Sequence, residues 1–212
     1  SLKWSADKKF EDDPRYRGEG KLAPKSAADL AFVEHMIYHM DETDGRVAVL
    51  LPHGVLFRGG AEEAIRKYII KDLNRLDAVI GLPANLFHGT GIPVCVLVLK
   101  SNRNGNSGNI LFIDASKEFK PGKNQNILEQ EHIDKIVDAY EKRAEIDKFA
   151  HKAYMSEIIE NGYNLNIPRY VDTFEEEEPV DLDAVRNRIK TLDSETKAAI
   201  DKAESFMREL GL

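Results

Sequence analysis

The sequence has a single cysteine, Cys95, among its 212 residues. It therefore has no disulfide framework, and a reducing cytoplasm is the expected compartment. No apolar run approaches the roughly 20 residues that a membrane-spanning helix needs, and the Lys-rich N-terminus does not resemble a signal peptide. No GxGxxG motif follows a predicted strand, which argues strongly against a nucleotide-binding oxidoreductase built on an open sheet. Because Cys95 lies inside an apolar run, we interpret it as a small core residue rather than a nucleophile.

The sequence also lacks an excess of basic residues, since its formal net charge is −7. Residues 1–130 hold 18 Lys and Arg against 17 Asp and Glu, whereas residues 131–212 hold 12 against 20. An acidic C-terminal region does not suit a nucleic-acid groove. If the chain contacts DNA, residues 1–130 are expected to make the contact.

Three short apolar runs organise the segment Gly45–Lys100, at Val47–Leu51, Ala78–Leu82 and Val94–Leu99. Their Val and Ile content and the Gly and Pro around them predict strands buried on both faces. Between the first two runs, Ala61–Asp72 has apolar residues at helical spacing. Strand, helix and strand with short connections predict a right-handed parallel crossover. The third run follows without a helical pattern and is expected to pair antiparallel beside the second, in the edge region of an open α/β sheet.

The residues before this segment predict a long loop at Ser1–Lys25 and then a helix with Ser26 as its N-cap. The predicted apolar face of that helix consists of Leu30, Val33, Ile37 and Met40. His35 and His39 lie one turn apart, as two metal ligands would. No third ligand is visible and the HExxH order is absent, so we favour the interpretation without a metal.

The residues after Lys100 predict a hydrophilic hairpin loop at Ser101–Asn109, followed by a strand at Ile110–Ile113. Pro121–Asn126 reads as a loop and a domain boundary, which divides the chain into residues 1–125 and residues 126–212. From Glu131 onward the pattern is helical, with an apolar face formed by Ile133, Ile136, Val137 and Tyr140.

The last part of the chain predicts an irregular connector at Asn161–Val171 and a solvated acidic linker at Glu175–Glu178. A long amphipathic helix follows, with a seam spaced by three and four residues. Its members are Leu182, Val185, Ile189, Leu192, Thr196, Ala199, Ala203, Phe206 and Leu210. The sequence leaves open whether this seam packs on its own domain or on a helix of another subunit.

Specific segments resemble the modification subunit of type I restriction-modification systems, a family of adenine-N6 DNA methyltransferases. They read VAVLLPHGVLFRGGAEEAIRKYII, IGLPANLFHGTGIPVCVLVLK and YNLNIPRYVD, and the residues upstream of them are also similar to that family. The similar blocks occur in the family's order over essentially the whole chain. The resemblance implies the later part of a Rossmann-like, S-adenosylmethionine-dependent methyltransferase sheet, mostly parallel with an antiparallel edge hairpin, followed by a helical C-terminal tail.

Two motifs of that family are absent from the sequence, namely the Gly-rich loop that wraps S-adenosylmethionine and the catalytic Asn-Pro-Pro-Phe tetrapeptide. By resemblance, Ser1 follows just after the tetrapeptide, so the chain is expected to be the C-terminal portion of such a subunit. Residues 1–125 would then belong to the catalytic domain and residues 126–212 to the helical region. No catalytic residue is expected within this chain, which we predict to be inactive alone.

The resemblance implies binding residues in two places. Phe87 matches the family position whose ring packs against the flipped adenine, although an ordinary loop aromatic covering the core would look the same. Gly89 and Gly91 around Thr90 would let this loop approach DNA closely. The resemblance places three cofactor-pocket residues in the predicted helix after Ser26, namely Asp29, Leu30 and Phe32.

Basic residues of the first loop are further candidates for phosphate contacts, although a solvated surface loop explains them equally well. They are Lys3, Lys8, Lys9, Arg15 and Arg17. His53 follows the first predicted strand near the expected site, but nothing in the sequence makes it an acid or a base.

By resemblance, the partners are DNA, a specificity subunit that reads the DNA sequence, a second modification subunit and a restriction subunit. The alternative function is a non-catalytic interaction module, a truncated or split subunit that docks the specificity subunit. Because a sheet without its central strands exposes an unpaired edge, we also expect the isolated chain to self-associate.

Overall fold

The computed structural model describes residues 10–16, 20–173 and 181–210. The chain divides into two compact units, Ser1–Thr173 and Phe174–Leu212. This division comes later than the boundary predicted at residue 126, because a strand that follows the boundary joins the same sheet as the earlier strands. The predicted acidic linker at Glu175–Glu178 and the basic residues Lys3, Lys8, Lys9 and Arg17 lie outside the described residues.

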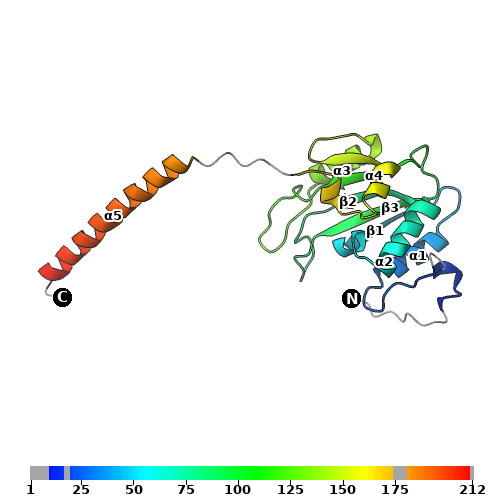
Figure 1. The fold of residues 1–212 in the computed structure, drawn as a ribbon, viewed down its shortest axis with the longest axis horizontal. Coiled ribbons are helices and arrows are strands. Elements are labelled where there is room, and N and C mark those ends of the chain that lie inside the picture. Colours follow the sequence, from blue (N-terminus) through cyan, green and yellow to red (C-terminus); the bar gives the residue numbers. More distant parts are fainter. Residues whose placement is uncertain (1–9, 17–19, 174–180, 211–212) are drawn as a thin grey trace. The chain divides into compact units, whose positions relative to one another are not determined.

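The first unit is built on a mixed sheet of five strands in the order β1-β3-β2-β4-β5 (Figure 1). The strands are β1 (Arg46–Pro52), β2 (Leu76–Gly81), β3 (Val94–Lys100), β4 (Asn109–Asp114) and β5 (Ala150–Tyr154). Strands β2 and β4 pair in parallel, and β3 pairs antiparallel with both β1 and β2. Strands β1, β2 and β4 therefore run in one direction. The expected α/β fold class, with an antiparallel strand beside β2, is confirmed.

Two details of the predicted topology are wrong. Strand β3 lies between β1 and β2 and not at an edge, so the crossover from β1 to β2 skips one position in the sheet. Residues 101–108 do not form a hairpin, because β4 pairs with β2 and β5 instead of β3. Pairing with β2 places the apolar β4 in the interior of the sheet, where both of its faces are buried. A hairpin with β3 would not give β4 this place beside β2.

Burial falls from the middle of the sheet toward β1. Every residue of β2 is buried, whereas β3 alternates between buried and half-buried side chains and β1 has only one buried residue, Leu51. The prediction of strands buried on both faces is therefore correct for β2 and wrong for β1 and β3. One face of these two strands is left open, and Leu50 on β1 keeps 44% of its surface exposed.

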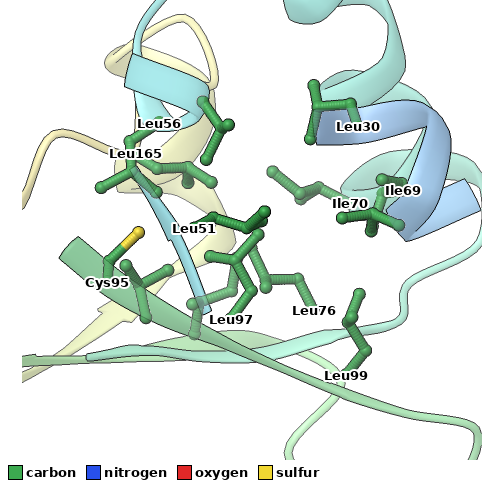
Figure 2. Packing of buried hydrophobic residues seen from close by; sticks show 14 of the residues in the cluster. Leu30, Leu51, Leu56, Ile69, Ile70, Leu76, Cys95, Leu97, Leu99 and Leu165 are labelled. Atoms are coloured by element: carbon green, nitrogen blue, oxygen red, sulfur yellow. The ribbon is translucent and has the colours of Figure 1, made fainter. Parts of the chain in front are cut away.

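One face of the sheet carries the larger core, covered by α1 (Asp29–His39), α2 (Ala61–Lys67) and α4 (Met155–Glu160). Figure 2 shows side chains of α1 and of the π-helical turn Tyr68–Asp72 above the strands, with Leu30, Ile69 and Ile70 facing Leu76, Leu97 and Leu99. Cys95 is fully buried in the same cluster, and burial raises the pKa of its thiol to about 12. A thiol of this kind is a packing group, which confirms the interpretation of Cys95.

The connector Asn161–Val171 closes this core. Its only regular turn is the 3-10 helix Ile167–Arg169, and Tyr170 stacks on Phe112 of β4 with ring centroids 3.9 Å apart. The Ile167 side chain also lies where a Cβ on Gly81 would stand, since Ile167 Cδ1 would be 2.6 Å from it. Glycine at the end of β2 is therefore needed for close packing of the connector.

The opposite face has a smaller core under α3 (Gln130–Lys142), which buries Ile136 and Ala139 against β2 and β4. The helix predicted from Glu131 is thus confirmed, although Ile133 and Val137 of its predicted apolar face stay exposed. The helix predicted with Ser26 as N-cap begins instead at Asp29, with Ala28 as N-cap and no side-chain cap.

A charged cluster ties the amino ends of β2 and β4 to the end of β3. Asp77 is fully buried, and its carboxylate lies 3.1 Å from Lys100 Nζ, 3.0 Å from an Arg143 nitrogen and 3.5 Å from Arg103 Nε. The Tyr140 hydroxyl donates a 2.8 Å hydrogen bond to the same carboxylate. Burial would raise the pKa of Asp77, but the hydrogen bond from Tyr140 and the charges of Arg143 and Lys100 outweigh it and hold that pKa below its usual range.

The second unit contains α5 (Leu182–Glu209), one continuous helix of 28 residues. Asp181 caps it, with its carboxylate accepting from the backbone N–H groups of Asp183 and Ala184 at 3.0 Å. No residue of α5 is buried, and the apolar side chains of the predicted seam are exposed, including Ile189 at 53% and Leu192 at 44%. Among the described residues, no helix is long and apolar enough to cross a membrane.

Candidate functional site

The carboxyl ends of three strands with a common direction mark the candidate site. Strand β1 ends at Pro52, β2 at Gly81 and β4 at Asp114. In open α/β sheets, ligands bind at the edge where the carboxyl ends of the strands meet. The segments that leave these ends are His53–Leu56, residues 82–93 and residues 115–129.

Residues 82–93, which we call the Phe87 loop, present an aromatic ring at this edge. Phe87 keeps 41% of its surface exposed, and the nearby Ile92 keeps 62%. The backbone N–H of Thr90 donates to the Phe87 carbonyl at 3.4 Å, and the Thr90 hydroxyl accepts from the Ile92 N–H at 3.3 Å. Gly89 makes this turn with φ of +76°, a conformation that a side chain would strain. Phe87, Gly89, Thr90 and Gly91 are therefore brought together in one exposed turn.

One carbonyl closes the base of the Phe87 loop. The oxygen of Val94, the first residue of β3, accepts from the Leu82 N–H at 2.9 Å. The same oxygen lies 3.0 Å from His53 Nε2, which donates to it in the matching tautomer. His53 thus links the end of β1 to the Val94 carbonyl, which also binds the start of the loop through the Leu82 N–H. Its role in the structure is that of a hydrogen-bond donor to the backbone.

A second loop holds the first limb of the Phe87 loop. Asn126 donates twice, from its backbone N–H to the Asn85 carbonyl at 2.8 Å and from its side-chain amide to the Ala84 carbonyl at 2.9 Å. Sequence reasoning missed Asn126, which it placed in a domain boundary. No local signal would have found it, because its partners are some 40 positions away in the chain and only the fold brings them together.

The three expected cofactor residues do not share one surface. Leu30 is 1% exposed and its side chain lies in the core, so only its backbone is available to a ligand. Asp29 lines a cleft of about 480 Å³ beside Pro52, and its carboxylate lies 3.8 Å from an Arg58 nitrogen. Phe32, 44% exposed, lines a different cleft of about 200 Å³ with Arg15 and His35. Successive helix residues point in directions about 100° apart, which separates these side chains.

The remaining candidates have local structural partners. Arg15 pairs with Asp13 through contacts of 2.9 and 2.6 Å and lies 3.3 Å from His35 Nδ1. The rings of His35 and His39 pack edge to face with centroids 4.5 Å apart. Within residues 10–16, 20–173 and 181–210, no group of three or more His, Cys, Asp or Glu side chains is arranged to hold a metal ion.

Comparison with known proteins places this arrangement in a family. The family model described as N-6 DNA Methylase matches residues 1–179. The chain belongs to this family. It is 38% identical to the type I restriction enzyme MpnII methylase subunit of Mycoplasma pneumoniae over 99% of its own length, and 38% identical to the MjaVII methylase subunit of Methanocaldococcus jannaschii over 89%.

A solved structure of this family agrees with the fold. The type I restriction-modification system methyltransferase subunit from Streptococcus thermophilus is 58% identical, with a TM-score of 0.78, over 81% of the present chain and 36% of its own. The chain spans 38% and 33% of the lengths of the two curated relatives. The resemblance of the quoted segments to the modification subunit of type I restriction-modification systems is thus confirmed.

Proposed function

We propose that this chain forms part of the modification subunit of a type I restriction-modification enzyme, which transfers a methyl group from S-adenosylmethionine to N6 of adenine in DNA. The observation that carries the proposal is Phe87, whose ring is 41% exposed on a braced loop at the carboxyl edge of the sheet. A large exposed aromatic at the usual ligand edge of an α/β sheet is a platform for a planar ligand.

The proposed role of Phe87 follows from the chemistry of the adenine amine. Inside a duplex this amine is stacked and paired, so an enzyme that acts on it extrudes the base at a cost of a few kcal/mol. Stacking of a base on an aromatic side chain contributes about 1–3 kcal/mol, which offsets much of that cost. Thr90 and the glycines Gly89 and Gly91 then form the part of the loop that approaches the DNA strand.

Bound S-adenosylmethionine would supply the methyl group, and the residues of this chain fit it in part. Asp29 offers a partly exposed carboxylate in the cleft at the end of β1, suited to a hydroxyl or ammonium group of the cofactor. Leu30 would contribute only its backbone. Phe32 borders a different cleft, so it would join the same site only if the cofactor reached both clefts.

The chain contains neither Asn-Pro-Pro-Phe nor a GxGxxG loop. We therefore assign the groups that polarise the adenine amine, and most of the cofactor pocket, to other parts of the subunit. In this assignment the chain has no catalytic residue of its own and is inactive alone.

The second candidate function is that of an interaction module, and α5 favours it. This helix exposes an apolar stripe along its length and buries none of it within residues 181–210. Such a stripe needs an apolar surface that covers it, and we propose a helix of the specificity subunit for this role. A second modification subunit, the restriction subunit and DNA complete the proposed assembly. Retention of the specificity subunit by the chain with and without residues 182–209 tests this function separately from catalysis.

The test of the proposed methyltransferase function is Phe87→Ala in the complete modification enzyme. Loss of the stacking platform should lower the rate of methyl transfer to duplex DNA about 10- to 100-fold. Phe87→Tyr should keep most of the rate, and the control Tyr154→Ala, which removes a 57% exposed aromatic on β5, should keep all of it. A Phe87→Ala enzyme that methylates at the normal rate would overturn the proposal.

A further inference from the structure

The loop that contains Asn126 is itself firmly built. Residues 120–127, which we call the Asn126 loop, are closed by reciprocal backbone hydrogen bonds between Lys120 and Ile127 at 2.9 and 3.0 Å. At its tip, a Cβ added to Gly122 would stand 2.3 Å from the Gln125 carbonyl oxygen, so only glycine fits this turn. The ends of the loop are thereby held in register and its tip is compact.

The Asn126 loop is also fastened to α3. Lys120 Nζ lies 2.7 Å from the Glu129 carboxylate. Glu129 is the N-cap residue of α3, where it forms a reciprocal capping box with His132. A continuous set of contacts therefore runs from the start of α3 through Glu129 and Lys120 to Asn126.

Two features make the partners of Asn126 important. Asn85 has a left-handed backbone with φ of +59°, a conformation that costs energy unless its surroundings hold it. Asn85 also lies two residues before Phe87, so its backbone angles set the direction in which the ring leaves the loop. The two hydrogen bonds from Asn126 fix the carbonyls on both sides of the Ala84–Asn85 junction.

We propose that Asn126 is a positioning residue for methyl transfer, which holds the Phe87 loop in the conformation that receives the extruded adenine. The inference rests on the proposed function, because it assigns Asn126 a role through Phe87 and not through a contact with DNA or cofactor. Reactions on a bound base are sensitive to small errors of placement. A platform on a loop therefore needs supporting contacts of this kind.

The experiment uses the complete modification enzyme with two DNA duplexes. One carries the natural target adenine and reports the rate of methyl transfer. The other carries 2-aminopurine, a fluorescent base without the N6 amine, at the same position and reports extrusion and stacking. Asn126→Ala removes the side-chain hydrogen bond to Ala84 and keeps the backbone bond to Asn85. Asn126→Asp keeps the size of the side chain but places a carboxylate against the Ala84 carbonyl. Asn124→Ala is the matched control, since Asn124 is an exposed asparagine of the same loop whose side chain makes no hydrogen bond in the described part of the chain.

We expect Asn126→Ala to lower the rate of methyl transfer about three- to tenfold, the change that the net contribution of one hydrogen bond produces. Asn126→Asp should lower it further. In both variants the extruded 2-aminopurine should become brighter, as in Phe87→Ala, because it stacks less well. Thermal unfolding should stay at the value for Asn124→Ala. Normal fluorescence and rate in both Asn126 variants would overturn the inference.

The double variant Phe87→Ala/Asn126→Ala separates this inference from the function on which it rests. If Asn126 acts through Phe87, its substitution should have no further effect once the ring is gone. An Asn126 effect of full size in the Phe87→Ala background would contradict the positioning role while leaving base stacking intact. A Phe87→Ala enzyme of normal rate and fluorescence would instead reject the proposed function itself.

Discussion

The two ends of the sheet are held together by different chemistry. At the amino ends of β2 and β4, the buried carboxylate of Asp77 is surrounded by Lys100, Arg103, Arg143 and the Tyr140 hydroxyl. At the carboxyl ends, the Phe87 loop is held by single hydrogen bonds to backbone carbonyls. The first arrangement satisfies charges inside the protein, and the second leaves an aromatic ring facing outward.

From this difference we propose that the amino ends are structural and the carboxyl ends functional. Charge-assisted hydrogen bonds around a buried group fix several elements in one geometry and leave little free capacity for a ligand. A loop with an exposed aromatic has such capacity, and its few supporting contacts keep the ring oriented. Substitutions at the amino ends should therefore reduce stability, and substitutions at the carboxyl ends should reduce activity.

The largest expected effect is that of Asp77→Asn. Removing the carboxylate charge leaves the buried Arg103 and the partly buried Arg143 without this counter-charge. Breaking a buried pair on one side costs about 3–5 kcal/mol. Urea denaturation should show this loss in the free energy of unfolding. The control is Asp138→Asn, which breaks an exposed pair with Lys142 at 2.6 Å and should change stability by less than about 1 kcal/mol. Equal effects of the two variants would remove the proposed distinction between the two ends.

Glu34 of α1 tests the same idea with a buried carboxyl group. It is 4% exposed, and neither of its carboxylate oxygens has a hydrogen-bond partner within residues 10–16, 20–173 and 181–210. Burial raises its pKa from 4.5 to about 8. Because the folded-state pKa is the higher one, the contribution of Glu34 to stability is fully present below pH 4.5 and is lost as the pH rises to about 8.

We therefore expect the chain to lose a few kcal/mol of stability between pH 5 and pH 8.5, since each pKa unit corresponds to about 1.4 kcal/mol. Glu34→Gln should remove most of this dependence and be the more stable protein at pH 8.5. Unfolding free energies of both proteins at the two pH values give the answer. Parallel pH profiles would show that Glu34 is charged and has found a donor.

The sequence predicts helices and strands well where burial of one face determines the spacing of apolar residues along the chain. The runs that become β1, β2 and β3, and the helix between the first two, have the expected type and nearly the expected bounds. It predicts the sheet less well, because pairing joins residues that are far apart in the chain. Strand β5 was missed for this reason, since its sequence AHKAY is short and half-polar and becomes a strand by pairing with β4.

The candidate site shows the same limit. Phe87, Gly89, Thr90 and Gly91 are neighbours in the chain, so a resemblance to a family segment was enough to group them. Asp29, Leu30 and Phe32 are also neighbours in the chain, but the helix turns their side chains toward different surroundings, so chain order alone does not place them on one surface. Asn126 and His53 gain their positions from contacts some 40 residues away, which no local pattern contains.

The smallest expected effect is that of His53→Ala, which probes the base of the Phe87 loop. The Val94 carbonyl would keep the Leu82 N–H as a partner, so no buried acceptor is left unsatisfied. Losing the second donor should cost about 0.5–1.5 kcal/mol and not the larger penalty of an unpaired group. Hydrogen exchange of the Leu82 amide should become faster by a similar free energy, because opening the base of the loop becomes easier. His88→Ala is the matched control, an exposed histidine within the loop that makes no hydrogen bond in the described residues. If both variants exchange at the normal rate, the loop is held by Asn126 and by the hydrogen bond between Leu82 and Val94, and the end of β1 does not contribute to the site.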